Sequence, residues 1–248
     1  MNRLLFILLF SIAATACGTE PQKNTAREVK ASEIIAMVDR GENICLDSCI
    51  VYGDLDFTAV KKFSKIAPEI GQIYIDCSLT FIRCIFLGKI SAYAYNPMVC
   101  TVFGRNLSFI DCDFRNETDF TECTVEGNAF FSGSVFRKKS LWQAAYFKYK
   151  VAYFTRTVFE DEAMFQNSVY AGDVHFVHAR FEKSAMFQGA VAAGLMMFGA
   201  VYFGGYVDFS YARADESVFK YAEFKDRTDF ANARIGNGVN EALKQQSQ

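Results

Sequence analysis

The chain has 248 residues, of which 51% are hydrophobic and 22% charged, so it can bury a sizeable core and lacks the composition of a disordered protein. Its 26 lysines and arginines against 28 acidic residues give a net charge of -2, which argues against a strongly basic nucleic-acid-binding domain and against an acidic mimic of DNA. The composition is unusual in its 26 phenylalanines, 12 tyrosines and only 3 prolines.

Residues 1–16 have the features of a signal peptide for export. Arg3 supplies a positive charge, Leu4–Ala13 is an apolar run, and Ala14-Thr15-Ala16 provides the small residues of a cleavage site. The apolar run is too short to cross a bilayer as a helix.

Cys17 follows this cleavage site directly. The segment Ala14-Thr15-Ala16-Cys17-Gly18 resembles a bacterial lipobox, although Ala14 stands where leucine is usual. The resemblance implies that Cys17 is diacylated and anchors the protein in a membrane of the bacterial cell envelope, on the periplasmic side or at the surface. The alternative is ordinary secretory cleavage at the same bond, which would give a soluble secreted or periplasmic protein.

Residues 17–44 are expected to form a lipidated tether and a capping helix. Gly18–Ala26 is polar and contains a proline, as is typical of a flexible tether. A helix is predicted from about Val29 to Arg40, because Ile34, Ile35, Met37 and Val38 make one apolar face and Gly41 is a helix stop. Its expected role is to cover the open end of a repeat structure.

The strongest signal in the chain is an internal repeat of large inward-pointing residues. Large residues recur in steps of five or six, with one-residue slips near Phe154 and Phe219, when Val125, Ala192, Ala214 and Ile235 fill the gaps between the aromatic positions. A small residue or valine stands two positions before nearly all of them. The aromatic positions are Phe109, Phe114, Phe120, Phe131, Phe136, Trp142, Phe147, Phe154, Phe159, Phe165, Tyr170, Phe176, Phe181, Phe187, Phe198, Phe203, Phe209, Phe219, Phe224 and Phe230.

This spacing predicts a narrow tube of short extended segments. Side chains at positions i and i−2 lie on the same side of an extended chain, so both point into the tube. Rings of successive coils can then stack in columns. A helix of period 3.6 cannot keep a repeat of five and six residues on one face.

The pattern is similar to that of the pentapeptide-repeat family, in its phenylalanine-rich variant with an eleven-residue double repeat, as in Ala163-Met164-Phe165 through Phe187. The resemblance implies an all-β fold, a right-handed quadrilateral β-helix with about four repeats per coil and roughly six to eight coils. It covers residues 103–236 as a regular solenoid and residues 45–102 as irregular first coils, with loops at Ala59–Ile70 and Ala92–Met98. It implies no activity, and for the tail 237–248 it allows a cap or an end-to-end homodimer.

Residues 184–207 contain no charge, and a hydropathy window would favour a transmembrane helix there. The repeat continues through them, so they are expected to be coils with apolar side chains outside. These outward residues are Met186, Ala193, Met197, Ala200 and Tyr202. They predict a surface for another protein, a second copy or the membrane; the alternative is that small exposed residues carry no function.

Acidic residues are absent between Glu126 and Glu160, where basic residues gather. The predicted stripe consists of Arg137, Lys138, Lys139, Lys148 and Lys150, and Arg156 lies in the same segment. Such a stripe predicts a site for anionic lipid headgroups or another polyanion, and the alternative is a solvated face.

The residues with chemical potential do not form a recognisable catalytic motif. Cys84, Cys112 and Cys123 occupy the small interior position, whereas Cys45 and Cys49 are candidates for a disulfide in an oxidising compartment. The only two histidines, His175 and His178, both fall at outward positions. We therefore expect no enzyme, no metal site and no cofactor.

These observations predict a non-catalytic scaffold or adaptor that is anchored in the envelope and presents a rigid solenoid surface to a protein or envelope partner. The alternative is a structural or stress-related envelope lipoprotein without a dedicated partner. The resemblance also suggests a DNA-mimicking topoisomerase protector, but export and the weak net charge disfavour this reading, so no nucleic acid is expected as a partner.

Overall fold

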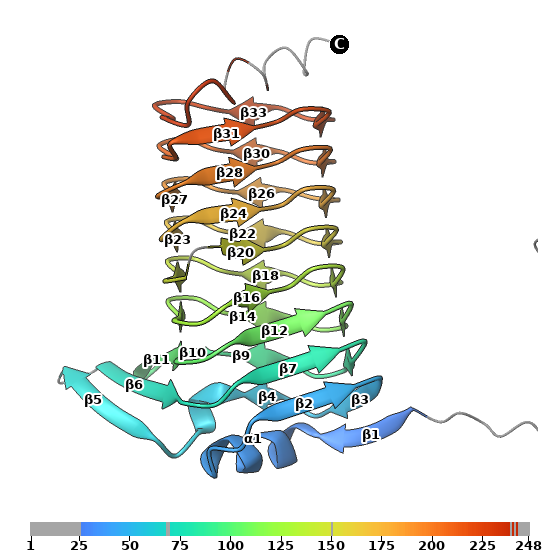
Figure 1. Ribbon diagram of the computed structural model, residues 1–248, viewed down its shortest axis with the longest axis vertical. Coiled ribbons are helices and arrows are strands. Elements are labelled where there is room, and N and C mark those ends of the chain that lie inside the picture. Colours follow the sequence, from blue (N-terminus) through green and yellow to red (C-terminus); the bar gives the residue numbers. More distant parts are fainter. Residues whose placement is uncertain (1–25, 68–69, 150, 239, 241, 243–248) are drawn as a thin grey trace, which may run out of the picture.

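The computed structural model describes residues 26–67, 70–149, 151–238, 240 and 242. The predicted signal peptide, Cys17, Lys150 and most of the C-terminal tail lie outside the described residues. The chain winds as a right-handed β-helix with four flat sides, and one short helix lies at its N-terminal end (Figure 1). The expected fold class, an all-β solenoid with a short N-terminal helix, is confirmed.

Each side of the tube is a sheet of stacked strands, and we number the sides face 1 to face 4 in chain order. Face 1 contains β2 (Ile44–Asp47), β7 (Leu79–Ile82), β12 (Leu107–Ile110), β16 (Ala129–Phe130), β20 (Val151–Tyr153), β24 (Asp173–His175), β28 (Leu195–Met197) and β31 (Glu216–Val218). Face 2 contains β1 (Arg27–Lys30), β3 (Cys49–Tyr52), β8 (Ile85–Phe86), β13 (Asp113–Phe114), β17 (Val135–Phe136), β21 (Val158–Phe159), β25 (Arg180–Phe181), β29 (Tyr202–Phe203) and β32 (Glu223–Phe224).

The other two faces complete each coil. Face 3 contains β4 (Leu55–Asp56), β9 (Ile90–Ser91), β14 (Thr118–Asp119), β18 (Ser140–Leu141), β22 (Ala163–Met164), β26 (Ala185–Met186), β30 (Val207–Asp208) and β33 (Thr228–Asp229). Face 4 contains β5 (Phe63–Ala67), β6 (Ile70–Ile75), β10 (Tyr93–Tyr95), β11 (Met98–Phe103), β15 (Thr124–Val125), β19 (Tyr146–Phe147), β23 (Val169–Tyr170) and β27 (Val191–Ala192), and ends in isolated bridges at Arg213 and Arg234.

After the first coils, which are longer, adjacent coils pair in parallel with a period of 22 residues, as between Thr118 and Ser140. The coil is one residue longer where Ala129 pairs with Ala152 and one residue shorter where Met196 pairs with Ser217. The two slips near Phe154 and Phe219 are therefore confirmed.

The predicted inward residues form the core. All the repeat aromatics are buried except Phe224 and Phe230, which belong to the last coil and are partly buried. Rings of successive coils stack in columns, with centroids 5.0 Å apart between Phe154 and Phe176 and 5.2 Å apart between Phe176 and Phe198. Offset stacking at this distance adds about 0.5–1.5 kcal/mol per pair to the burial of the rings.

The N-terminal cap differs in its start from the sequence-based expectation. The helix α1 spans Ala31–Asp39, whereas Val29 belongs to β1, which pairs in parallel with β3 and covers the first edge of face 2. Ile34 and Val38 are buried against the first coil, and the chain turns after the helix at Gly41, whose φ is 74°. A strand is favoured before the helix because the first coil would otherwise leave backbone groups unpaired.

The two expected loops in the first coils are β-hairpins. The chain leaves the tube after a short 3-10 helix, Phe57–Ala59, and returns through the antiparallel pair β5 and β6; β10 and β11 make a second antiparallel pair. Because β6 pairs in parallel with β11, the four strands form one small sheet that protrudes sideways at the α1 end (Figure 1). We call β5, β6, β10 and β11 the wing.

Candidate functional site

The side chains that most often carry catalysis are spread over the tube. Within the described part of the chain, no group of three or more His, Cys, Asp and Glu residues is arranged to hold a metal ion. His175 lies on face 1, with its ring centroid 5.2 Å from that of Tyr153, whereas His178 is exposed at a corner with a φ of 59°. Histidine is one of the few side chains that tolerate this left-handed turn conformation, so His178 has a structural explanation.

The cysteines divide into interior and exterior positions. Cys84, Cys112 and Cys123 are buried in the small interior position as expected. Cys45 is exposed on β2, whereas Cys49 is buried on β3, and both are free thiols. The candidate disulfide between them is therefore wrong: the chain turns a corner between the two residues, and their side chains point to opposite sides of the wall.

Two of the interior thiols, Cys112 and Cys123, are poor nucleophiles, whereas the hydrogen bond with Cys112 lowers the pKa of Cys84 to about 7. Burial raises the pKa of the Cys123 thiol well above its ordinary value, and its hydrogen bond with Cys84 together with burial raises that of Cys112. The reactive form of cysteine is the thiolate, so a raised pKa keeps these groups inert at neutral pH. Their role is packing.

The predicted basic stripe is neutralised by acids from neighbouring coils. Arg137 makes ion pairs with Asp113 and Glu160, at 2.7 and 2.9 Å. Two further members are also paired. These pairs join Lys139 to Glu162 at 2.8 Å and Lys148 to Glu126 at 2.7 Å. Lys138 is exposed, and Lys150 lies outside the described residues.

The stripe prediction failed because distance along the chain does not measure distance on the surface. Residues about 22 positions apart are vertical neighbours, so acids that are far away in the sequence lie beside the bases. The basic residues are also divided between the edge of face 2, the following corner and face 4. The structure therefore does not support a polyanion site there.

The five residues of the predicted apolar patch all lie outside the core, but they do not form one patch. Met186 is on face 3, Ala193 follows the face 4 strand β27, Met197 is on face 1 and Tyr202 on face 2, while Ala200 lies at the corner between the last two. Since the chain turns a corner after each repeat, successive outward residues face different directions. The patch as predicted is therefore wrong.

Face 1 carries a continuous column of mainly apolar residues, with His175 in its middle, that the sequence analysis did not identify. It consists of Phe130, Tyr153, His175, Met197 and Val218, which pair across five successive coils and are all half-buried. The rings of Phe130 and Tyr153 stack at 5.2 Å with an interplanar angle of 10°. We call these five residues the face-1 column. Reading the outward residue of every fourth repeat, with the two slips included, would have revealed it.

The surroundings of the face-1 column are also largely uncharged. Ile110 and Val151 are half-buried on the same face, Val177 is half-buried in the turn after β24, and Leu195 is 36% exposed. Asp173, an acid on this face, accepts a hydrogen bond from the backbone N–H of Leu195 in the next coil at 2.8 Å. Its carboxylate is thus already engaged, and the surface around the column is mostly apolar.

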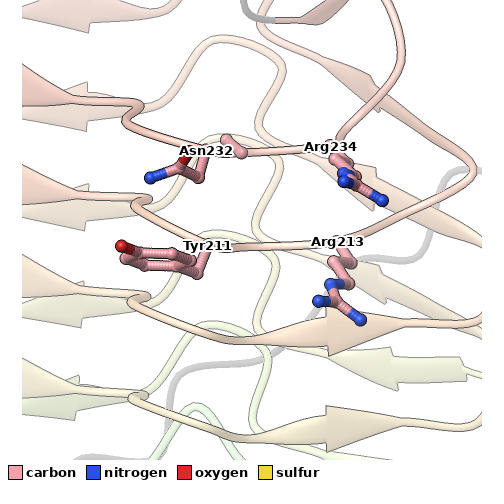
Figure 2. Close-up of a pocket in the computed structure, with 5 residues that line it drawn as sticks. Tyr211, Arg213, Asn232 and Arg234 are labelled. Atoms are coloured by element: carbon pink, nitrogen blue, oxygen red, sulfur yellow. The ribbon is translucent and has the colours of Figure 1, made fainter.

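A second surface feature is a shallow pocket at the C-terminal end of face 4, with a volume of about 280 Å³. Figure 2 shows its polar side chains in two columns, with Asn232 above Tyr211 and Arg234 above Arg213. The ion pairs among the described residues include neither arginine. Two guanidinium groups beside a phenol and an amide can bind a carboxylate or a phosphate.

No helix in the described part of the chain has the length and apolar character needed to cross a membrane. Comparisons of the chain with protein-family models, with curated proteins and with solved structures returned no match.

Proposed function

We propose that this protein is a non-catalytic scaffold of the bacterial cell envelope, anchored by lipid on Cys17, which binds a protein partner through the face-1 column. The observation that supports this proposal best is the column itself. Half-buried aromatic and aliphatic side chains over five coils have no role in the interior of the tube, and contiguous apolar surface of this kind marks interaction sites.

The backbone beneath the face-1 column favours binding. Every strand of face 1 is hydrogen-bonded to the coils before and after it, except at the two ends. A surface that is already ordered loses little conformational entropy when a partner binds, so more of the contact energy appears as affinity. The expected partner presents an apolar surface, because aromatic and methionine side chains are favoured at the centres of such interfaces.

The anchor supplies the cellular location in this proposal. Diacylation of Cys17 would hold the protein at a membrane without a spanning helix. The same face would then act as a local docking surface rather than as a freely diffusing binder. The resemblance of the repeat to the pentapeptide-repeat family is compatible with this role, since that fold is not tied to one activity.

The proposal predicts that a charge on the face-1 column abolishes partner capture. Cells that carry the protein at its native level are treated with a crosslinker, and the protein is purified with its attached partners for mass spectrometry. Met197→Lys is expected to lose the partner, because a lysine there would have to be desolvated in the interface. Met186→Lys is the matched control, since Met186 is equally half-buried but lies on face 3.

A partner recovered equally with both variants would refute the assignment to face 1. Recovery of only lipid and abundant envelope proteins in all samples would favour a structural lipoprotein instead. Cys17→Ser, with metabolic labelling by radioactive palmitate and cell fractionation, tests the anchor separately. Unchanged labelling and membrane retention of this variant would refute lipidation at Cys17.

A further inference from the structure

The free end of the wing exposes apolar side chains. Tyr95 is 73% exposed and Ile66 57% exposed, and both lie beside the turns of the two hairpins. The strand pairing places Tyr95 opposite Met98, and Met98 beside Ile70, so the tip of the wing is apolar across its strands. Side chains that project from the tube do not contribute to its core. Their exposed apolar surface therefore indicates contact with a membrane or with another molecule.

The outer strand of the wing, β5, and the two residues that lead into it are basic. Lys61, Lys62 and Lys65 are all exposed, and none of them takes part in the ion pairs between described residues. Residues 61–75 contain Glu69 as their only acid, and the strands β10 and β11 contain no charged residue. The wing therefore combines a net positive charge with an apolar tip.

The aromatic ring at the start of β5 is held in place by a glycine. A Cβ atom at Gly71 would lie 2.0 Å from the Phe63 ring, so the absence of a side chain at Gly71 provides the space for that ring. Phe63 nevertheless stays 52% exposed. It extends the apolar surface from the tip towards the lysines.

The lysines also argue against the binding of another strand to the open edge of β5. One edge of β5 pairs with β6, and its other edge pairs with no described strand. An open strand edge is a template for strand addition, and lysines on the edge are a common way to prevent it. Two copies that met along β5 would bring their lysines together, whereas an anionic surface would attract them.

The wing lies at the end of the molecule where the anchor would be. The described chain enters through β1 at the α1 end, which is also the end from which the wing protrudes (Figure 1). Arg27 lies ten positions after Cys17, and a fully extended chain of this length spans about 35 Å at most. A lipid on Cys17 would thus keep the wing close to the bilayer.

We propose that the wing is a lipid-binding site, with Lys61, Lys62 and Lys65 on the phosphates of anionic headgroups and with Ile66 and Tyr95 inserted in the interfacial region. This inference deepens the proposed function and rests on its membrane location. The lysine stems and the amphipathic tyrosine ring suit a boundary between water and hydrocarbon. The wing would add a second attachment to the lipid on Cys17, so that the face-1 column is held away from the bilayer.

The test is co-sedimentation of the mature chain, residues 17–248 with Cys17→Ser, with vesicles of phosphatidylglycerol and phosphatidylcholine. This form lacks the lipid and the signal peptide but retains every described residue. We expect binding that weakens with added salt and is much weaker to pure phosphatidylcholine. The triple variant Lys61→Gln, Lys62→Gln, Lys65→Gln should lower the partition coefficient by tenfold or more, at about 1 kcal/mol per lysine.

Matched controls remove the same charge elsewhere. The variant Arg156→Gln, Lys220→Gln, Arg227→Gln removes three exposed positive charges away from the wing and should bind like the parent protein. Tyr95→Ser and Ile66→Ser should weaken binding, whereas Tyr221→Ser, at a tyrosine that is 69% exposed far from the wing, should not. An equal loss of vesicle binding in the variant that lacks the distant positive charges would overturn the proposal. Dimerisation through β5 without vesicle binding would also overturn it.

A second readout reports insertion directly. In a Trp142→Phe background, which removes the only tryptophan, Tyr95→Trp should show a blue-shifted emission that brominated lipids quench. An unquenched tryptophan at this position would overturn the insertion of the tip. Both measurements use pure lipid and a chain without a lipid anchor. Their outcome is therefore independent of whether the face-1 column binds a protein partner and of whether Cys17 is lipidated.

Discussion

At the scale of single residues, the interior of the tube depends on the pairing of a large and a small side chain. Small polar residues are tolerated in the small position because they donate hydrogen bonds to the backbone of the preceding coil. The Ser134 hydroxyl donates to the Phe109 carbonyl at 2.8 Å, and the Thr157 hydroxyl donates to that of Phe131 at 3.1 Å. Cys, Ser, Thr and Ala are therefore interchangeable along the chain, whereas the rings are not.

Removal of one stacked ring should be costly. Phe181 is buried, with ring centroids 4.8 Å from Phe159 and 5.2 Å from Phe203. We expect Phe181→Ala to lower the free energy of unfolding by about 3–5 kcal/mol, because both the burial and the stacking are lost and a cavity remains. Urea denaturation measures this value. Gln188→Ala, at an exposed position in the next repeat, is expected to change it by less than about 0.5 kcal/mol, and equal effects would contradict the assignment of inside and outside.

At the scale of elements, short strands separated by corners decide which way each side chain points. Thr118 and Asp119, for example, lie on the same two-residue strand, yet the first is buried and the second accepts a hydrogen bond from its own turn at Thr121. Strand length therefore matters less than the position within the repeat. The wing is the exception, because its longer strands pair as hairpins outside the tube.

The strand positions of the cysteines make a prediction about thiol accessibility. A maleimide reagent at neutral pH should modify Cys45 rapidly and Cys84, Cys112 and Cys123 only on unfolding, because Cys45 is exposed while burial hides the others and raises the pKa of Cys123. Mass spectrometry of time points from a Cys17→Ser protein gives the rates. Cys45→Ser should remove the fast phase, and rapid labelling of Cys123 in the folded protein would show that Cys123 does not face the core as described.

At the scale of the whole molecule, the tube is a one-dimensional stack. Each coil contacts the coils before and after it, and the stack is capped by α1 and β1 at its start. The stability of such a stack is approximately a sum over coils and their interfaces. The length of the molecule is therefore adjustable in units of one coil.

Deletion of one complete coil should preserve the fold. Residues 174–195 are one repeat unit, because Val174 pairs with Met196. The shortened protein is expected to keep its far-ultraviolet circular dichroism and a cooperative thermal transition, whereas deletion of residues 174–181 should abolish both. The shorter deletion is not a multiple of the repeat, so it places polar residues of the following coils inside the tube. A folded protein after both deletions would contradict a strict register.

The sequence alone was sufficient to predict the winding of the chain and the interior of the tube, because these depend on local periodicity. A ring and its small partner are two residues apart, and the extended chain directs both inward whatever the distant residues are. The one-residue slips near Phe154 and Phe219 were visible for the same reason. The start of the N-terminal cap could not be predicted in this way, because β1 forms only where β3 offers an open strand edge.

Surface features depended on the tertiary structure. Lys148 and Glu126 are 22 residues apart in the chain but 2.7 Å apart in space, and Met186 and Met197 are close in the chain but lie on different faces. The face-1 column and the wing tip consist of residues brought together by coil stacking and by hairpin pairing. The local pattern thus determined which side chains point outward, and only the stacking of the coils decided which of them meet, because neighbours on a face are separated by a full turn of the chain.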